Sequence, residues 1–591
     1  MLSKFYLNKN ILFFHYNFTN IRYNDIGEVM ENRKIIRIVL LSIIFVLLIL
    51  FVFGLRKMYL KSYEKKLVDI DWLRKNVSIE ENSKLGNGIY YVKKNADINI
   101  YNKNYRKVIS EKFEEIRDKK YSLYDPLIIY NLYGTNLLSL NIYFETEELS
   151  SVDYTISVSD KNISSFSRTL KNNGEDNLTK NHEYQIIGFV NGYINTLKLT
   201  VKDKNEKVIE EKEIKVDFRD IKTNSNTTLE VTDGSSTQEL SEGLYVHLGN
   251  DSGEQDYVSL YDNDGILRGE IPIIGYRAHD ILFKEDKMYF SISQTKIASI
   301  NSLGEVTKVY NTGNYYLHHD YTFDDDGNIL VLANNRDKTT EEDCIIKINL
   351  DTKEVTEILD LEDMFKSYVE TCELDKESVR DEGEDGLDWI HINSIEYVDG
   401  DIIISSRETS SIIRINNIED NPTLKYILSD KALWENTDYI EYVYEKVGDF
   451  KIHAGQHYVR YIPSKEEGVY YLTLFDNNYG KQTSQPQFDY KTIGITNTNP
   501  FNGDNSYYYK YKVDENNNTF ELIDSFEVLY SGIVSSSKTM ENNNIVIDSG
   551  TKGVYAEYDE YHNLIRKYKV SLNKYMLYRV IKYDFNDFWF E

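Results

Sequence analysis

Apolar and polar residues alternate in short runs over most of this chain, and turn-forming residues separate the runs. From residue 243 to the C-terminus the runs recur with Asp, Asn or Gly between them, which is typical of antiparallel strands joined by tight turns. The runs fall into groups that resemble one another, and this self-similarity predicts a six-bladed β-propeller over residues 229–591. The six groups span residues 244–275, 276–312, 316–360, 388–430, 455–525 and 528–570. The final run, "YMLYRVIKYDF", is placed to complete a sheet and close the ring.

The same alternation fills residues 85–228, where runs such as "LLSLNIYFET" and "YINTLKLTVKD" predict a small antiparallel β-sandwich. A stretch rich in Ser, Thr, Asn and Gly follows and marks the domain boundary near residue 228. The chain is therefore predicted to be all-β over both domains.

An uncharged apolar run, Ile38–Leu55, interrupts this pattern near the N-terminus and is long enough to span a bilayer. No small-residue cleavage site follows it, so we expect an uncleaved transmembrane helix at 35–57. Residues 1–34 are expected to be a leader that is disordered or, because Met30 is an alternative start, untranslated. Residues 58–84 have apolar spacing that predicts a juxtamembrane helix.

The net charge and the cysteine content limit the classes of partner and of covalent cross-link that this chain can have. The formal net charge is -28, which argues against nucleic-acid binding because phosphate contacts need clustered Lys and Arg. Cys344 and Cys372 are the only cysteines, too few for a disulfide framework, and either one disulfide or two thiols would fit.

Four histidines occupy the same place in successive propeller repeats, just before or at the start of a strand: His279, His319, His391 and His457. Equivalent positions of blades point to one place, so these imidazoles are predicted to converge. Arg407 ends the strand "DIIISSR" one hairpin after His391 and is expected to return to the same rim. A site made of these side chains is suited to bind a small anion. The Arg guanidinium can donate two parallel hydrogen bonds to an oxyanion, and His can donate a hydrogen bond or attack as a nucleophile.

The six other histidines are interpreted as ordinary partly buried residues; they are His15, His182, His247, His318, His453 and His562. A metal site is the natural competitor for a histidine cluster, but an arginine within it would repel a cation and no HExxH motif is present. The sequence has no P-loop or GxGxxG signature either. We therefore predict neither a metal nor a cofactor. A cell-surface propeller that binds a ligand without catalysis is the alternative function.

Several segments taken in order, "HHDYTFDDDGNILVLAN", "DWIHINSIEYVDGDIIISSRETSSIIRIN", "GQHYVRYIP" and "LTLFDNNYG", resemble the bacterial aryl-sulfate sulfotransferases over roughly residues 120–570. The resemblance implies an extracytoplasmic six-bladed propeller that follows a small β-sandwich. It also implies sulfuryl transfer from a phenolic sulfate ester to a phenol through a sulfated histidine, without phosphoadenosine phosphosulfate. On this basis we expect a single-pass protein of the cell membrane with its catalytic domain outside, and the resemblance allows a homodimer.

Carried over by motif, the histidine of "GQH", His457, matches the family's nucleophile. His319, His391 and Arg407 match the positions that stabilise charge. The resemblance implies substrate contacts at His279 and at a serine of "YSGIVSSSK", for which we take Ser535. Glu408 directly follows Arg407, and its negative charge is unfavourable in a site that binds anions. We therefore expect it to affect which acceptor phenol the site prefers.

Overall fold

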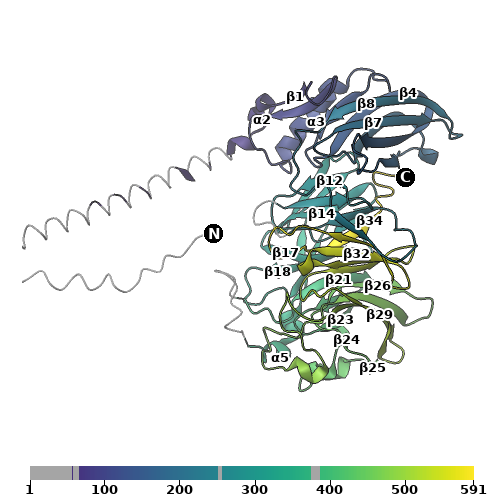
Figure 1. The fold of residues 1–591 in the computed structure, drawn as a ribbon. Coiled ribbons are helices and arrows are strands. Elements are labelled where there is room, and N and C mark those ends of the chain that lie inside the picture. Colours follow the sequence, from purple (N-terminus) through teal and green to yellow (C-terminus); the bar gives the residue numbers. More distant parts are fainter. Residues whose placement is uncertain are drawn as a thin grey trace, which may run out of the picture. The chain divides into compact units, whose positions relative to one another are not determined.

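The computed structural model describes residues 65–250, 256–373 and 386–591, together with isolated residues between 41 and 61. It divides into two compact units, Met1–Trp72 and Leu73–Glu591, and the second holds both predicted β domains (Figure 1). The predicted leader and transmembrane segment lie outside the described residues, apart from those isolated positions. None of the helices described is both long enough and apolar enough to traverse a bilayer.

Of the helix predicted over 58–84, the described part ends with α2 (Ile70–Asn76). The prediction was wrong beyond that residue, because Val77 begins strand β1 (Val77–Glu81), which pairs antiparallel with β2 (Ile89–Lys94). In "VSIEE" β-branched residues alternate with polar ones, a pattern that favours a half-buried strand over a helix.

The N-terminal β domain is built on β4 (Ser139–Val158), which pairs with β3, β5, β6 and β7. Its other strands are β3 (Leu127–Tyr130), β5 (Phe166–Thr169), β6 (Thr179–Ile187), β7 (Ile194–Lys202) and β8 (Val208–Asp217). The pair β1 and β2 joins the same sheet, and because β2 runs parallel to β3 the prediction of a purely antiparallel sandwich was wrong at this edge. The domain also contains α3 (Lys103–Arg117), so the expectation of strands alone needs correction. Asn102 caps this helix by accepting from two backbone N–H groups, and its buried side chains follow helical spacing.

Six four- or five-stranded sheets form the propeller, as the repeats predicted (Figure 1). Blades one and two consist of β10 (Leu244–His247), β11 (Tyr257–Tyr261), β12 (Leu267–Pro272) and β34 (Val580–Tyr583), then β13 (Ile281–Lys284), β14 (Lys287–Ser293), β15 (Lys296–Asn301) and β16 (Val306–Asn311). Blades three and four consist of β17 (Tyr315–Phe323), β18 (Ile329–Asn335), β19 (Cys344–Ile348) and β20 (Val355–Asp360), then β21 (Ile392–Val398), β22 (Asp401–Ser406), β23 (Ser411–Asn416) and β24 (Thr423–Leu428). Blades five and six consist of β25 (Glu445–Val447), β26 (His457–Pro463), β27 (Val469–Asp476), β28 (Ser506–Asp514) and β29 (Thr519–Val528), then β30 (Ser536–Thr539), β31 (Ile545–Ser549), β32 (Val554–Tyr558), β33 (Leu564–Lys569) and β9 (Glu230–Asp233).

Strands from both ends of the propeller segment close the ring. β34, from the C-terminal run, pairs with β10 in blade one, while β9 pairs with β33 in blade six. Each end therefore completes a sheet begun by the other, and the ladder donors and acceptors of these edges are satisfied. The closing role predicted for the last apolar run is confirmed.

Short helical turns connect the strands: α4 (Leu361–Met364), α5 (Lys366–Val369), α6 (Lys431–Trp434), η2 (Glu175–Asn177), η3 (Ile440–Tyr442), η4 (Tyr490–Ile493) and η5 (Gly550–Lys552). Around α4 to α6, Phe365 packs against Trp389 and Trp434, and all three side chains are buried. Cys344 in β19 is buried, Cys372 after α5 is half-buried, and both are free thiols.

Charged side chains from four blades meet where their inner strands converge. The Arg460 guanidinium in β26 lies 2.9 Å from carboxylate oxygens of both Asp280 and Asp320 and 3.4 Å from Glu396. Arg579, just before β34, donates to the carbonyl oxygens of His279 and Asn393 at 3.1 and 2.8 Å. These buried contacts tie blades one to five together directly beside the histidine positions.

Candidate active site

The structure brings three of the predicted imidazoles together from three different blades. The ring centroid of His319, in β17, lies 4.9 Å from that of His391 and 6.4 Å from that of His457. His391 stands immediately before β21 and His457 begins β26. All three side chains are nearly or fully withdrawn from solvent.

An irregularity of the backbone recurs at these positions. His319 and His391 have φ values of 51° and 49°, and Tyr458, directly after His457, has 56°. The strand register shifts at the same points in β17, β21 and β26. Left-handed backbone is unfavourable for residues other than glycine, so its use in three blades indicates a bulge retained to aim the side chains.

The hydrogen bonds of His457 fix its tautomer. Its Nδ1 lies 2.8 Å from Oδ1 of Asn477 and 3.0 Å from the carbonyl oxygen of Gly455. The Asn477 amide is oriented by its own Nδ2, which donates to the carbonyls of Ser531 and Val534 at 2.6 and 3.0 Å. Both partners of Nδ1 are therefore acceptors, so Nδ1 carries the proton and Nε2 keeps its lone pair. Burial lowers the pKa of His457 to about 3, which keeps the ring neutral.

His391 stands between two carboxylates. Its Nδ1 lies 2.7 Å from an oxygen of Asp388 and 2.7 Å from an oxygen of Glu342, which sits in the loop between β18 and β19. Burial and the neighbouring Arg407 act to lower the pKa of His391, but Asp388 and Glu342 outweigh them and raise it above its ordinary value. The two carboxylates thus favour the imidazolium form of His391 beside a neutral His457.

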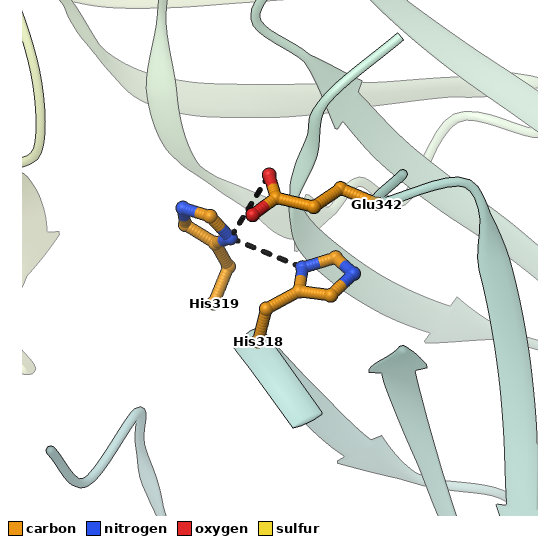
Figure 2. A group of neighbouring side chains, drawn as sticks. All are labelled: His318, His319 and Glu342. Carbon is orange, nitrogen blue, oxygen red and sulfur yellow. Dashed lines mark hydrogen bonds and ion pairs between the residues drawn. The ribbon is translucent and has the colours of Figure 1, made fainter. Parts of the chain in front are cut away.

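Glu342 also faces a pair of adjacent histidines, as Figure 2 shows. His319 Nδ1 lies 3.8 Å from Glu342 and 3.0 Å from Nδ1 of His318. Burial lowers the pKa of both histidines, so each is neutral and one donates to the other. His318, interpreted from sequence as an ordinary residue, contacts the cluster directly because the bulge at His319 changes the usual alternation of the strand.

Arg407 returns to the rim beside His391, as its hairpin predicted. Its backbone N–H donates to the carbonyl of His391 at 3.1 Å, one residue past the pairing of β21 with β22. The guanidinium pairs with the buried Glu408, whose other oxygen accepts from the N–H and hydroxyl of Thr483 at 2.6 and 3.0 Å. Its Nε is buried and has no hydrogen-bond partner within the described part of the chain, which leaves a donor for an anion.

His279 and Ser535 both contact Tyr578, the former through its ring and the latter through a backbone hydrogen bond of 3.2 Å to the Tyr578 carbonyl. The Tyr578 ring separates His279 from His319, with centroids 6.0 and 6.3 Å from theirs. His279 Nδ1 lies 3.0 Å from the Ser291 hydroxyl, and its buried Nε2 is unpartnered among the described residues. Ser535 is buried with φ of 88°, and its hydroxyl accepts from the N–H of Gly550 at 3.0 Å. Their contacts with substrate stay predictions.

Among the described residues, acidic and histidine side chains form three groups with ligand atoms within 4.8 Å of one another, a spacing that a metal ion could use. The groups are His318, His319 and Glu342; Glu342, Asp388 and His391; and Asp343, Asp360 and Glu362. Lys338 already occupies the third as an ion-pair partner, with its Nζ 2.5 Å from Asp360 and 2.9 Å from Glu362. A cation in the first two would compete with the Nδ1 hydrogen bonds described above and meet the charge of Arg407.

Sequence reasoning missed the side chains that orient the imidazoles. Asp388 and Asn477 lie within the segments quoted above, three residues before His391 and twenty after His457. A carboxylate or amide near a candidate catalytic histidine is a signal that could have found them. Glu342 and Tyr578 come from other parts of the fold, and no local pattern connects them with the histidines.

Comparisons with solved structures return proteins of low similarity. A Bacteroides caccae protein of unknown function is 11% identical, with TM-score 0.33, covering 58% of this chain and 100% of that one. A putative 6-phosphogluconolactonase from Bacteroides uniformis is 10% identical, with TM-score 0.32, covering 73% and 97%. Virginiamycin B lyase from Staphylococcus aureus, solved as an inactive variant with quinupristin, is 13% identical, with TM-score 0.27, covering 58% and 100%. No curated protein matches the sequence.

Two family models match the chain and together cover both of its β domains. The arylsulfotransferase Ig-like domain matches residues 127–218, the strands from β3 to β8. The arylsulfotransferase (ASST) model matches residues 230–586, which is more than half of the chain and the whole propeller from β9 to β34. The chain therefore belongs to the arylsulfotransferase family, and family membership implies an enzyme that transfers a sulfuryl group between aryl sulfates and phenols.

Proposed function

We propose that this enzyme works by a ping-pong mechanism in which Nε2 of His457 takes the sulfuryl group from an aryl sulfate and passes it to a phenol. The observation that carries the proposal is the Asn477 amide, which holds the proton of His457 on Nδ1 and leaves the Nε2 lone pair free to attack. No cofactor such as phosphoadenosine phosphosulfate is needed, because the donor is itself a sulfate ester.

In the first half-reaction the Nε2 lone pair attacks sulfur, the N–S bond forms and the bond from sulfur to the aryl oxygen breaks. The departing oxygen takes a proton from His391, the one imidazole of the three that its neighbours keep charged. His457 then carries the sulfuryl group and a positive ring, which Asn477 Oδ1 stabilises through the Nδ1 proton. A free phenol leaves, and His391 is neutral.

In the second half-reaction an acceptor phenol occupies the vacated place and gives its proton to His391. The phenol oxygen attacks sulfur, the N–S bond breaks, and both histidines return to their starting states. Arg407 and His319 stabilise the sulfuryl oxygens in both directions, and the buried Nε of Arg407 is the available charged donor. Positioning and fixed charge thus supply most of the rate, as they do in phosphoryl transfer.

Steady-state kinetics with an aryl sulfate and a second phenol test this scheme. A ping-pong enzyme gives parallel double-reciprocal lines when the donor is varied at several fixed acceptor concentrations. Phenol release that the acceptor does not stimulate would instead indicate a hydrolase, and intersecting lines would indicate direct transfer within a ternary complex. His457→Asn should abolish both half-reactions, whereas His562→Asn, a partly exposed histidine of blade six, should leave them unchanged.

We further propose that the catalytic part lies on the outer side of the cell membrane, held by the apolar run at 38–55. The support is the length of that run and its lack of charge. Membrane fractionation of cells expressing the full chain, followed by protease treatment of intact cells, tests it. Activity that sediments with membranes and is lost on external proteolysis is the expected result, and activity protected inside intact cells would contradict it.

A further inference from the structure

Glu342 occupies a position that the mechanism above leaves unexplained. It is a half-buried acid in a site that must hold a sulfate ester, and acids at such a place oppose an anion. Its carboxylate lies 2.7 Å from His391 Nδ1 and 3.8 Å from His319 Nδ1, so it touches imidazoles from two blades. Its own backbone has a φ of 54°, an uncommon conformation that the fold retains.

We propose that Glu342 and Asp388 are positioning residues that hold His391 as the charged general acid and favour its recharging by the proton of the acceptor phenol in the second half-reaction. This inference rests on the proposed function, because it assigns the acid that the transfer needs. Asp388 accepts the hydrogen bond of His391 Nδ1 at 2.7 Å, and Glu342 lies 2.7 Å from the same nitrogen as an ion pair, so the proton is held on Nδ1 and Nε2–H is left for the aryl oxygen.

The division of labour between the imidazoles follows from these contacts. Nδ1 of His457 faces a neutral amide, and the ring stays neutral and nucleophilic. Nδ1 of His391 faces two carboxylates, and the ring stays charged and acidic. Two groups of the same residue type are thereby given opposite proton states a short distance apart, which is how acid and nucleophile are assigned within one site.

Glu342 also remains an anion in this arrangement. Burial acts to raise its pKa, but the positive charge of His391 outweighs burial and holds it well below its ordinary value. The positive charge of Arg407 lowers the pKa of His391, and without Glu342 only the negative charge of Asp388 would act against it. Glu342 supplies a second negative charge, and we expect the removal of either carboxylate to make His391 a weaker proton carrier.

The test compares Glu342→Gln and Asp388→Asn with Glu362→Gln, a partly exposed acid paired with Lys338 outside the site. Donors with a poor and a good leaving group, phenyl sulfate and 4-nitrophenyl sulfate, are used for each variant. Loss of a general acid matters most when the leaving oxygen needs a proton, so we expect turnover of phenyl sulfate to fall on the order of 10²-fold and that of 4-nitrophenyl sulfate by less than about tenfold. Glu362→Gln should match the wild type with both donors.

A second readout does not depend on activity. Proton NMR of protein with ¹⁵N-labelled histidine, assigned by comparison with His391→Asn, follows the titration of His391 directly. The wild-type imidazolium should persist above neutral pH, and its midpoint should fall by about 1 to 3 pH units in Glu342→Gln, because an opposite charge in contact is lost.

Three results would overturn the inference: a His391 ring that is neutral at pH 7 in the wild type, equal losses with the two donors, or activity that a chelator removes and Zn²⁺ restores. A wild-type enzyme that makes no sulfated histidine but still shows a charged His391 would instead count against the proposed function and leave the positioning role standing.

Discussion

Oδ1 of Asn477 lies 2.8 Å from Nδ1 of His457, and the same amide donates to two carbonyls at the start of blade six. The carbonyls of Ser531 and Val534, just before β30, therefore hold the amide that orients the His457 nucleophile of blade five. Asn477→Ala removes the shorter of the two acceptors of Nδ1 and leaves only the Gly455 carbonyl at 3.0 Å, which weakens the preference for the proton on Nδ1, so we expect the turnover rate to fall about 10- to 100-fold. Burst kinetics of phenol release measure the effect.

The matched control for that variant is Asn517→Ala, an exposed asparagine in the turn between β28 and β29. It should keep wild-type rates. An Asn477→Ala enzyme with an unchanged burst would show that the amide has no part in setting the tautomer of His457.

Substitutions of Arg407 test whether the planar shape or the positive charge of its guanidinium matters more for binding the sulfuryl group. Arg407→Lys keeps the charge but loses the planar pair of donors, so we expect kcat/KM for the donor to fall on the order of 10²-fold, nearly as far as in Arg407→Ala. Initial rates at low donor concentration give this ratio. Recovery of most of the activity by lysine would mean that the guanidinium acts only as a point charge.

The Arg460 cluster should matter for stability rather than for chemistry. Arg460→Met leaves the carboxylates of Asp280, Asp320 and Glu396 without their common partner, and we expect unfolding to become easier by about 3 to 5 kcal/mol. Urea unfolding followed by tryptophan fluorescence measures the loss. Lys93→Met, which breaks an exposed pair with Glu80, should cost less than about 1 kcal/mol, and equal effects would contradict the difference in burial.

Buried histidines should make the fold sensitive to acid. Burial lowers the pKa of His182 to about 4 and the pKa values of His247, His453 and His457 to about 3. Unfolding returns these rings to their ordinary pKa near ~6.5, so the unfolded state binds more protons between those values. Their contribution is complete above about pH 6.5 and is lost as pH falls toward 3, at up to about 1.4 kcal/mol per pH unit for each ring.

Thermal unfolding measured between pH 4 and 8 checks this direction. The melting temperature should drop steadily below about pH 6.5, and His247→Phe, which keeps an aromatic ring against Tyr261, should flatten part of the slope. A melting temperature that rises on acidification would contradict the neutral state of these histidines.

Much of the propeller could be predicted because each blade repeats one alternation of apolar and polar positions. The groups 276–312 and 388–430 contain β13 to β16 and β21 to β24, and the last run closes the ring as β34. The α3 helix was missed although its signals were present: an asparagine cap and buried residues at Tyr105, Val108 and Ile109, spaced three and four apart. The alternating strand pattern in the rest of residues 85–228 favoured a prediction of strands for this segment as well.

The site was harder to predict for a physical reason. Register placed His319, His391 and His457 at equivalent blade positions, so their approach to one another could be inferred from sequence alone. The left-handed backbone at His319 brings the His318 side chain into the cluster, and no residue type in the sequence indicates this bulge. Glu342 reaches His391 only through the packing of one blade against the next, and such contacts between distant segments have no local pattern.

Mass spectrometry of rapidly quenched enzyme tests the central claim, that Nε2 of His457 carries the sulfuryl group. The enzyme is mixed with excess aryl sulfate without acceptor, quenched at alkaline pH and digested. We predict one added SO₃ on the peptide that contains His457, its disappearance when phenol is added before the quench, and its absence in His457→Asn. A sulfated residue elsewhere, or transfer to phenol that persists in His457→Asn, would contradict the account.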